Sequence, residues 1–245
     1  MIRAWLRRVA CGGLMIMTTS PVPTDTQMPS GYEVRRTDAT QAALLDGDPT
    51  AWRDAAVITW GPEPYTTRLR ALWSVEALWL RFDAVDAAPW STMTERDDPI
   101  WNEEVVEIFL DLDGSGTNYA ELEISPANVV CDVRMVQGLP DKQMDLSWNL
   151  EGVETRVDHG DVDGGRGWTA RARVPWAGFA SLPSAAGVAL PPRSGNTWRF
   201  NAFRIKRPYG PAEPDRDVIF AAWSDPGAAG FHVPAAFRPF RLVEP

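Results

Sequence analysis

The feature that most constrains the fold is a run of alternating side chains at residues 103–112. From position 106 on, every even residue is apolar, whereas the odd positions include Glu107 and Asp111. Successive side chains of a β-strand point to opposite faces of the sheet, so the pattern predicts a strand whose even face lies on a core. The two acids that begin the run, Glu103 and Glu104, are expected to be exposed to solvent.

A second alternating run, residues 119–125, follows after a short segment rich in Gly, Asp and Asn. One face of this run holds Tyr119, Glu121 and Glu123, and the other face is apolar. Segments rich in Asp and Gly form tight turns between antiparallel strands. Residues 103–125 therefore predict a β-hairpin with one apolar face and one acidic, aromatic face.

Similar short runs, separated by Gly, Pro, Asp and Asn, continue along the chain from about Tyr32. No long segment has helical periodicity, although a helical turn or two is expected at residues 49–56 and 175–181. Many short strands at modest spacing predict an all-β fold, an antiparallel β-sandwich or jelly roll, in a single domain over residues 30–245. The other predicted strands are residues 67–75, 77–85, 128–136, 168–176, 197–205, 217–225 and 237–245. Five tryptophans within them are expected in the core: Trp73, Trp79, Trp168, Trp176 and Trp198.

The charge of the chain limits the partners it can have. The 245 residues carry a net charge of −9, and residues 1–28 contain three arginines and one aspartate, so the rest carries −11. An acidic body repels the phosphate backbone, and nucleic acid is therefore not expected as a partner. No apolar run approaches the ~20 residues that a membrane-spanning helix needs. Composition does not predict the oligomeric state.

The N-terminus resembles a secretory signal peptide. Residues 1–28 start with a basic stretch, continue with a short apolar segment and end in a polar segment that contains proline. This order favours export to the periplasm or the extracellular space, with a disordered leader as the alternative. Removal of the leader would leave Cys131 as a single cysteine, which is expected to be a buried thiol in a strand.

Several of these segments, taken in order, are similar to the family 9 carbohydrate-binding modules, a DOMON-like β-sandwich. The resemblance rests on "LLDGDPTAW" near the start, "ALWSVEALWLRFDAVD", the central "PIWNEEVVEIFLD", and then "WTARARVPW", "WRFNAFRI", "AWSDP" and "FHVPAAFRPFRLV". It covers nearly all of residues 32–245. It implies a sandwich that binds the chain ends of glucan or xylan, in polysaccharide catabolism, by stacking a sugar between two aromatic rings.

Carried over by position, the resemblance assigns the first ring to Trp101 and the carboxylate that accepts sugar hydroxyls to Glu107. The place of the second ring holds Phe231 instead of tryptophan. Two further positions depart from the family pattern, because Glu123 stands where an arginine is expected and Ala228 lies near the expected asparagine. These departures leave the fold prediction standing and leave the identity of the sugar open.

The residue types in this set suit a saccharide. An aromatic plane packs on the C–H face of a pyranose, carboxylates accept from hydroxyls, and Arg and Asn supply donors. Arg204 and Asn201 could be those donors, but they are three residues apart and a regular strand would place them on opposite faces. Arg204, facing Glu107 or Glu123, is the preferred donor. His232 is a further donor at the rim, although a structural role suits it equally.

Structural interpretations compete with these roles, and three other functions remain open. Trp101 could belong to the core, and Glu107 could form an ion pair across the sheet.

A glycoside hydrolase would need two carboxylates about 5–10 Å apart, such as Glu107 with Glu121 or Glu123. A b-type haem would need ligands such as Met135, Met144 or His159. Asp111 and Asp113 offer hard oxygen ligands for a structural calcium, whereas an ordinary hairpin turn explains them as well. Beyond calcium, no cofactor is expected.

Overall fold

The computed structural model describes residues 30–245, and the predicted signal peptide at 1–28 lies outside them. This part of the chain is built almost wholly from strands. The strands are β1 Tyr32–Arg36, β2 Val57–Trp60, β3 Thr67–Trp73, β4 Ala77–Val85, β5 Val105–Asp111, β6 Thr117–Ile124, β7 Val130–Gln137, β8 Gln143–Asp145, β9 Glu154–Val162, β10 Gly165–Pro175, β11 Thr197–Lys206, β12 Ile219–Ala222 and β13 Arg238–Val243. The helices are α1 Gln41–Asp46 and the short 3-10 turns Ile100–Asn102, Trp176–Ser181, Pro183–Ala185, Gly210–Ala212 and Pro234–Ala236.

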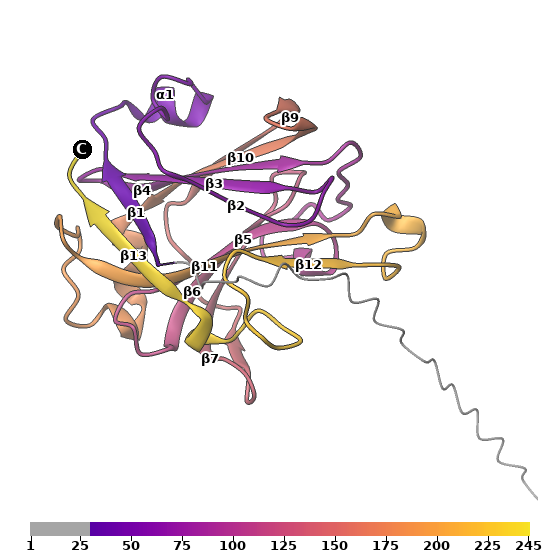
Figure 1. Cartoon of the computed structure of the whole chain (residues 1–245). Coiled ribbons are helices and arrows are strands. Elements are labelled where there is room, and N and C mark those ends of the chain that lie inside the picture. The colour runs from indigo at the N-terminus through magenta and orange to yellow at the C-terminus, as the bar shows by residue number, and fades with distance from the viewer. Residues whose placement is uncertain (1–29) are drawn as a thin grey trace, which may run out of the picture.

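The strands form one hydrogen-bonded ladder that folds over into two layers (Figure 1). Its order is β8-β7-β6-β5-β11-β13-β1-β3-β4-β10-β9, with β12 beside β11 and β2 beside β3. We call β2, β3, β4, β9 and β10 layer A, and β5, β6, β7, β8, β11 and β12 layer B. Strands β1 and β13 run obliquely between the layers along one side, and β1 is parallel to both of its neighbours. The prediction of an all-β sandwich is confirmed.

The space between the layers is the main core. The even face of β5, with Val106, Ile108 and Leu110, packs there against the apolar faces of layer A, as the alternation predicts. Trp73, Trp168, Trp176 and Trp198 also belong to this core, and Trp79 is buried on the outer face of layer A. The predicted hairpins β3–β4 and β5–β6 are both present.

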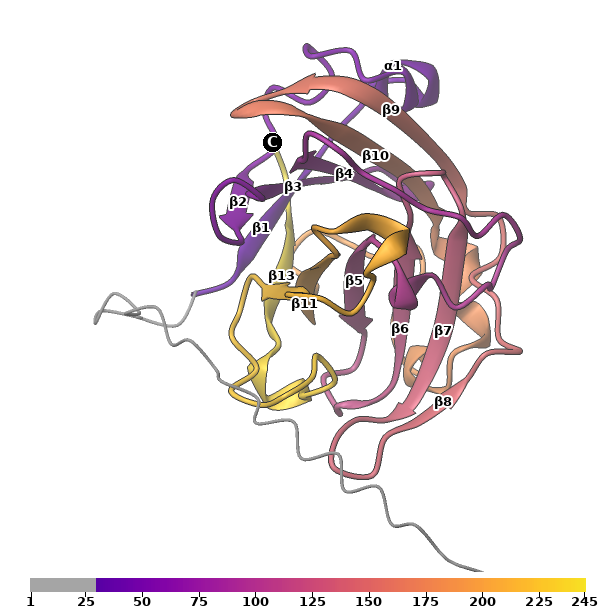
Figure 2. The same ribbon diagram turned by 90° about the vertical axis from the view of Figure 1, so that its right-hand side faces the viewer.

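The outer face of layer B is also covered, which the alternation did not predict. The odd positions of β5 are buried, and their apolar members form a second cluster with neighbouring strands and with the chain after β12. Figure 2 shows β5, β6 and β7 side by side, with the orange and yellow C-terminal segments beside β11. This cluster contains Val105, Phe109, Tyr119, Cys131, Val133, Met135, Phe203, Ile205, Phe231 and Phe237.

The expectation that Glu103 and Glu104 are exposed is wrong. Glu103 accepts hydrogen bonds from the backbone N–H and the hydroxyl of Thr92 and from the hydroxyl of Ser91, and so holds the loop before the 3-10 turn Ile100–Asn102. Glu104 is fully buried and accepts a 2.7 Å bond from Nζ of Lys206. Both acids lie between the 3-10 turn Ile100–Asn102 and the start of β5, where they are buried.

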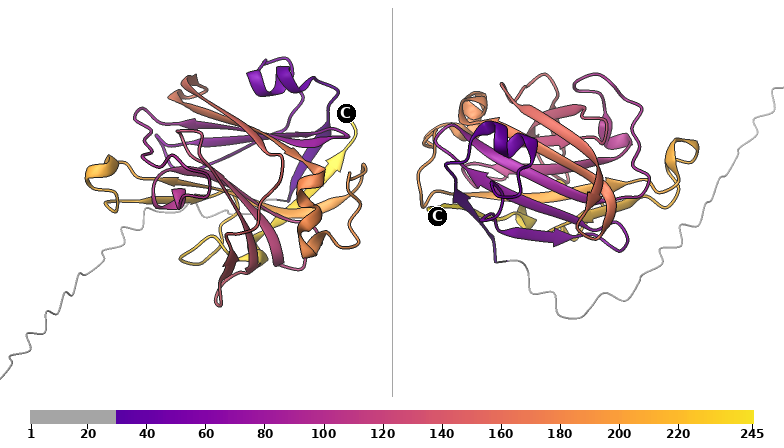
Figure 3. Two further views of the ribbon diagram at one scale, coloured as in Figure 1. Left: turned by 180° about the vertical axis from the view of Figure 1, so that it is seen from behind. Right: turned by 90° about the horizontal axis from the view of Figure 1, so that it is seen from above.

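Helix α1 and four strands, β1, β2, β8 and β9, are not among the segments predicted from the sequence, because they are short or polar. Helix α1 has six residues, too few to display a helical period, and it is delimited by Thr40, which accepts from the backbone N–H of Ala43, and by Gly47 at φ 79°. Helix α1 covers layer A from outside (Figure 3, right). Strand β9 is an edge strand with few apolar residues. The predicted turn at 175–181 is present as Trp176–Ser181, whereas residues 49–56 form turns and no helix.

None of the helices among residues 30–245 is both long enough and apolar enough to cross a membrane.

Candidate functional site: an acidic, aromatic cavity on layer B

A cavity of about 1150 Å³ lies on the outer face of layer B. Its lining comes from the odd face of the β5–β6 hairpin, from the β7–β8 hairpin, from the 3-10 turn Ile100–Asn102, and from the chain around and after β12. Five of the seven predicted site residues line it: Trp101, Glu107, Glu123, Phe231 and His232. The hairpin face that the sequence marked as acidic and aromatic is thus the floor of the cavity.

Three glutamates lie together on this floor because of the strand register. Glu107 on β5 is directly opposite Glu123 on β6, and Glu121 is two residues before Glu123 on the same face. One carboxylate oxygen from each lies within 4.8 Å of the others. All three side chains are buried, and like charges directly opposite one another destabilise a sheet. This arrangement therefore needs compensation from protons or from a ligand.

The environment of the three carboxyl groups favours their protonated forms. Burial, followed by the charge of Glu121, raises the pKa of Glu107 well above its usual range. Burial raises the pKa of Glu121 to about 7, and burial together with Glu107 and Glu121 raises the pKa of Glu123 well above its usual range. The positive charge of Lys142 opposes this effect and lowers the pKa of all three groups. The cluster therefore retains protons near neutral pH when no ligand is bound.

Two of the buried carboxylate oxygens lack a partner. Oε1 of Glu107 and Oε2 of Glu123 have no hydrogen bond to any residue in the part of the chain that the structure describes. Buried polar atoms are normally paired, because an unpaired one loses its hydration without replacement. Both glutamates line the cavity, so a ligand with hydroxyl groups or positive charge could supply the missing contacts.

Aromatic rings form part of the wall. Phe231 is 8% exposed and stacks on Phe203, with ring centroids 4.2 Å apart. Phe220 stands edge-on to Phe231 at 5.9 Å and is 62% exposed. Trp101 is half-buried and packs against the cluster of layer B. Phe231 therefore offers little free surface, whereas Phe220 and Trp101 offer more.

His232 is held in a defined position at the edge of the acid cluster. Its ring stacks on Phe109 at 5.0 Å, its Nδ1 lies 3.3 Å from the hydroxyl of Tyr119, and its Nε2 lies 2.8 Å from Nζ of Lys142. Burial and the charge of Lys142 lower the pKa of His232 to about 3, so the ring is neutral at physiological pH. Because an ammonium can only donate, Nε2 accepts from Lys142 and Nδ1 carries the proton.

The preferred donor, Arg204, does not face the glutamates, and that expectation is wrong. Arg204 is buried on the opposite face of β11, between the layers, where its Nη2 donates to Oδ2 of Asp86 at 2.6 Å. Lys206, on the same face, donates to Asp86 at 2.9 Å and to Glu104 at 2.7 Å. The guanidinium of Arg204 also lies 5.7 Å from the ring of Trp168. Arg204 and Lys206 thus form an interior charge network with the two acids.

Asn201 is also absent from the cavity lining. Its amide donates to the carbonyl of Ser224 at 2.7 Å and accepts from the backbone N–H of Ser224 at 3.0 Å. It thereby fixes the chain after β12 to β11. As their spacing predicts, Asn201 and Arg204 lie on opposite faces of the strand.

The proposed calcium ligands Asp111 and Asp113 form the hairpin turn that was the alternative interpretation. The carboxylate of Asp111 accepts from the backbone N–H groups of Gly114 and Gly116 at 3.1 and 2.9 Å, and Asp113 accepts from that of Ser115 at 2.9 Å. Both oxygens of Asp111 are thus used within the turn. Over residues 30–245, the close group of three potential metal ligands is the glutamate cluster.

The potential haem ligands do not converge on the cavity. Met135 is buried in the cluster of layer B, and Nε2 of His159 on β9 lies 2.8 Å from the carbonyl of Pro126. Met144 does line the cavity, as the cross-strand neighbour of Met135.

Sequence reasoning assigned no ligand-binding role to Lys142, Phe220 or Glu121. The alternation already placed Glu121 on the same face as Glu123, so its presence in the cavity could have been predicted from the sequence. Lys142 lies in the β7–β8 hairpin and Phe220 in the short strand β12, and no local pattern shows that these segments meet the β5–β6 hairpin.

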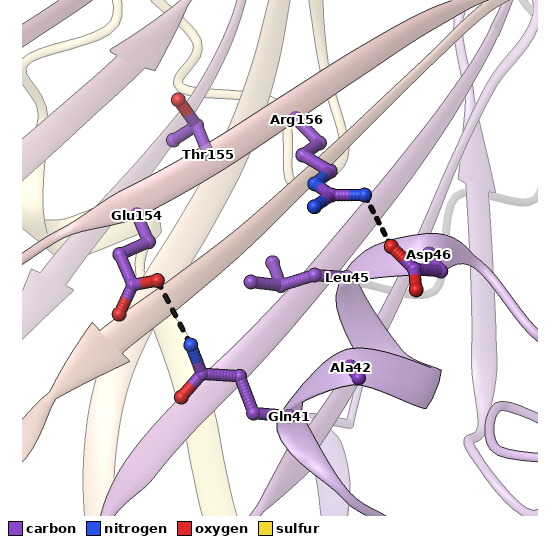
Figure 4. A pocket seen from close by; sticks show the side chains of 7 residues that line it. All are labelled: Gln41, Ala42, Leu45, Asp46, Glu154, Thr155 and Arg156. Carbon is purple, nitrogen blue, oxygen red and sulfur yellow. Dashed lines mark hydrogen bonds and ion pairs between the residues drawn. The ribbon is translucent and has the colours of Figure 1, made fainter.

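A smaller cavity of about 380 Å³ separates α1 from β9 (Figure 4). Its polar groups are already paired, because Gln41 donates to Glu154 at 2.8 Å and Arg156 forms an ion pair with Asp46. These contacts fasten the helix to the edge strand, so the cavity on layer B is the better candidate for a ligand.

Comparison with known proteins gives one relative in sequence. No family model matches the chain. A protein of Arthroderma benhamiae, named "extracellular protein", is 28% identical over 193 residues, which are 74% of this chain and 80% of the relative.

Three solved structures share the architecture. A protein of Bacteroides uniformis proposed to bind carbohydrate superposes with a TM-score of 0.65 at 14% identity, over 87% of this chain and all of that one. A family 9 carbohydrate-binding module of Caldicellulosiruptor kristjanssonii, in complexes with cellotriose and with glucose, superposes with TM-scores of 0.58 and 0.59 at 13% identity, over 87% of this chain and 94% and 96% of the module. At these identities the likeness concerns the fold, and the chain therefore has the fold of the family 9 carbohydrate-binding modules.

Proposed function

We propose that this protein binds a carbohydrate, without catalysis, in the cavity on layer B. The observation that carries the proposal is that buried carboxylate oxygens without partners and aromatic rings line one cavity. The modules with the same fold bind cellotriose and glucose, which supports a saccharide as the ligand.

The chemistry of the lining suits a sugar with several hydroxyl groups. A hydroxyl is both donor and acceptor, so it can donate to Glu107 or Glu123 and satisfy the oxygens that lack partners. His232, predicted as a donor at the rim, has both ring nitrogens engaged with Tyr119 and Lys142, so it would shape the cavity without binding a hydroxyl. Trp101 would pack on the C–H face of a ring, and Phe231 would support the opposite wall from its stack on Phe203. Glucan and xylan chain ends are the first ligands to test, in line with a role in polysaccharide catabolism.

Export from the cell belongs to the same proposal. The N-terminal pattern favours it, and the relative from Arthroderma benhamiae is named as an extracellular protein. A secreted protein that holds chain ends would act beside enzymes that degrade the polymer.

Replacing Trp101 by alanine should weaken saccharide binding about tenfold, because an aromatic face contributes on the order of 1 kcal/mol or more to stacking on an apolar surface. Isothermal titration calorimetry with cello- and xylo-oligosaccharides measures this effect. Tyr209→Ala is the matched control, since Tyr209 is an exposed aromatic residue outside the cavity lining. An unchanged affinity in Trp101→Ala would remove this residue from the site, and a lack of binding to every saccharide tested would contradict the proposed function.

The same oligosaccharides test the alternative of hydrolysis. A hydrolase would use two of the neighbouring carboxyl groups of Glu107, Glu121 and Glu123 as its catalytic acids. Release of reducing sugar that is lost in Glu107→Gln would replace the binding proposal by a hydrolase.

A further inference from the structure

The acid cluster of the cavity forms no ion pair with a lysine or arginine of the described part of the chain. Among residues 30–245, no lysine or arginine forms an ion pair with Glu107, Glu121 or Glu123, and their one contact with a basic side chain is His232 Nδ1, 3.9 Å from Oε2 of Glu121. Because Nε2 of that ring accepts from the ammonium of Lys142, the ring is neutral and supplies no counter-charge.

The basic residues around the cavity form their hydrogen bonds elsewhere, although the charge of Lys142 still acts on the three acids. Lys142 donates to His232, and Arg207 binds Asp215 at 2.9 Å and the carbonyl of Pro214 at 2.7 Å. Arg204 and Lys206 lie on the other face of β11 with Asp86. Buried carboxylates are normally paired with a cation or bound to a metal, so the counter-charge is expected from outside the chain.

The geometry of the cluster matches a divalent cation. Calcium binds carboxylate oxygens at about 2.3–2.6 Å, so two of its ligands lie at most ~5 Å apart. The oxygens of the three glutamates lie within 4.8 Å of one another, and two of the buried oxygens have no partner. Magnesium demands a strict octahedron at about 2.0–2.1 Å and usually keeps several waters, so a set of three carboxylates favours calcium.

We propose that Glu107, Glu121 and Glu123 bind a calcium ion at the floor of the cavity. This site is separate from the Asp111–Asp113 turn, and its existence does not depend on saccharide binding. The cavity lining leaves room for water or for ligand hydroxyl groups at the remaining coordination positions.

The test is calorimetry and thermal unfolding of the full chain, freed of metal with a chelator, in the presence of calcium or magnesium. We expect one calcium ion per chain, a rise of the melting temperature with calcium concentration, and a weaker response to magnesium. Glu123→Gln and Glu107→Gln should each weaken calcium binding by about tenfold or more, because each removes a charged ligand.

Glu154→Gln on β9 is the control, since Glu154 lies outside the cluster, and it should bind calcium like the parent protein. Circular dichroism of the variants without metal checks that they fold. If Glu107→Gln or Glu123→Gln does not fold, Glu121→Gln is measured in its place. A parent protein without calcium response, or glutamine variants that retain the full response, would overturn the proposal. A response to glucosamine without one to calcium would also overturn it, since the missing charge would then be an amine.

Discussion

Replacing Asp86 by alanine should lower the free energy of unfolding by about 3–5 kcal/mol. Asp86 lies between the layers and accepts from Arg204 at 2.6 Å and from Lys206 at 2.9 Å, and all three side chains are almost completely buried. Its removal would leave two cations in the interior with Glu104 as their remaining acidic partner. An uncompensated buried charge is far less stable than a paired one, so this effect should exceed that of any surface ion pair.

Chemical denaturation at constant pH measures the effect, and the chain offers a matched control. Asp215 pairs with Arg207 at 2.9 Å, but the Asp215 side chain is 94% exposed. Asp215→Ala should therefore lower the free energy of unfolding by about 1 kcal/mol or less. A loss below that of the control in Asp86→Ala would show that the interior network does not stabilise the fold.

In metal-free buffer, the free energy of unfolding should fall by at least about 2 kcal/mol as the pH rises from 6.5 to 8. Burial, and after it the negative charge of Asp86, raises the pKa of Glu104 from 4.5 in the unfolded chain to about 8. Burial raises the pKa of Glu121 from the same unfolded value to about 7. Between the unfolded and the folded pKa, such a group binds a proton only in the folded state. Its contribution to stability is complete below the unfolded pKa and is lost as the pH rises through the folded pKa. Each group of this kind lowers the free energy of unfolding by about 1.4 kcal/mol per pH unit.

His232 changes the free energy of unfolding with pH in the opposite direction to the acids, and it does so in a lower pH range. The pKa of His232 is lowered from 6.5 to about 3, so its contribution rises with pH over that range and is nearly constant above pH 6.5. Glu107→Gln should flatten the profile between pH 6.5 and 8, because the pKa of Glu107 lies well above its usual range. Glu154→Gln should leave the profile parallel to that of the parent. A flat or rising profile in the parent protein would contradict the buried, protonated acid cluster.

The face assignments within strands could be predicted from sequence alone. The period of two in residues 103–112 placed Val106, Ile108 and Leu110 in the core, and the same rule put Glu107, Glu121 and Glu123 on one face. These assignments hold because the pleat of a strand sets the direction of every side chain locally.

The alternation within a strand could not predict which distant segments cover each face of the sheet. The odd face of β5 is buried under a cavity wall that includes Phe220, Phe231 and His232, more than a hundred residues further along the chain. Glu104 was expected in solvent because its partner Lys206 is 102 residues away, and Arg204 was expected at the glutamates although it meets Asp86, 118 residues away.

The sequence by itself thus determined the sandwich, the acidic hairpin and five of the residues that line its cavity, since these depend on the alternation of neighbouring side chains and on the order of the segments. The tertiary structure alone decided which charges are paired. Ion pairs between distant segments depend on how the two layers close on each other. This closure directs Arg204 and Lys206 to the interior and, within residues 30–245, leaves the three glutamates without an ion pair to a lysine or arginine.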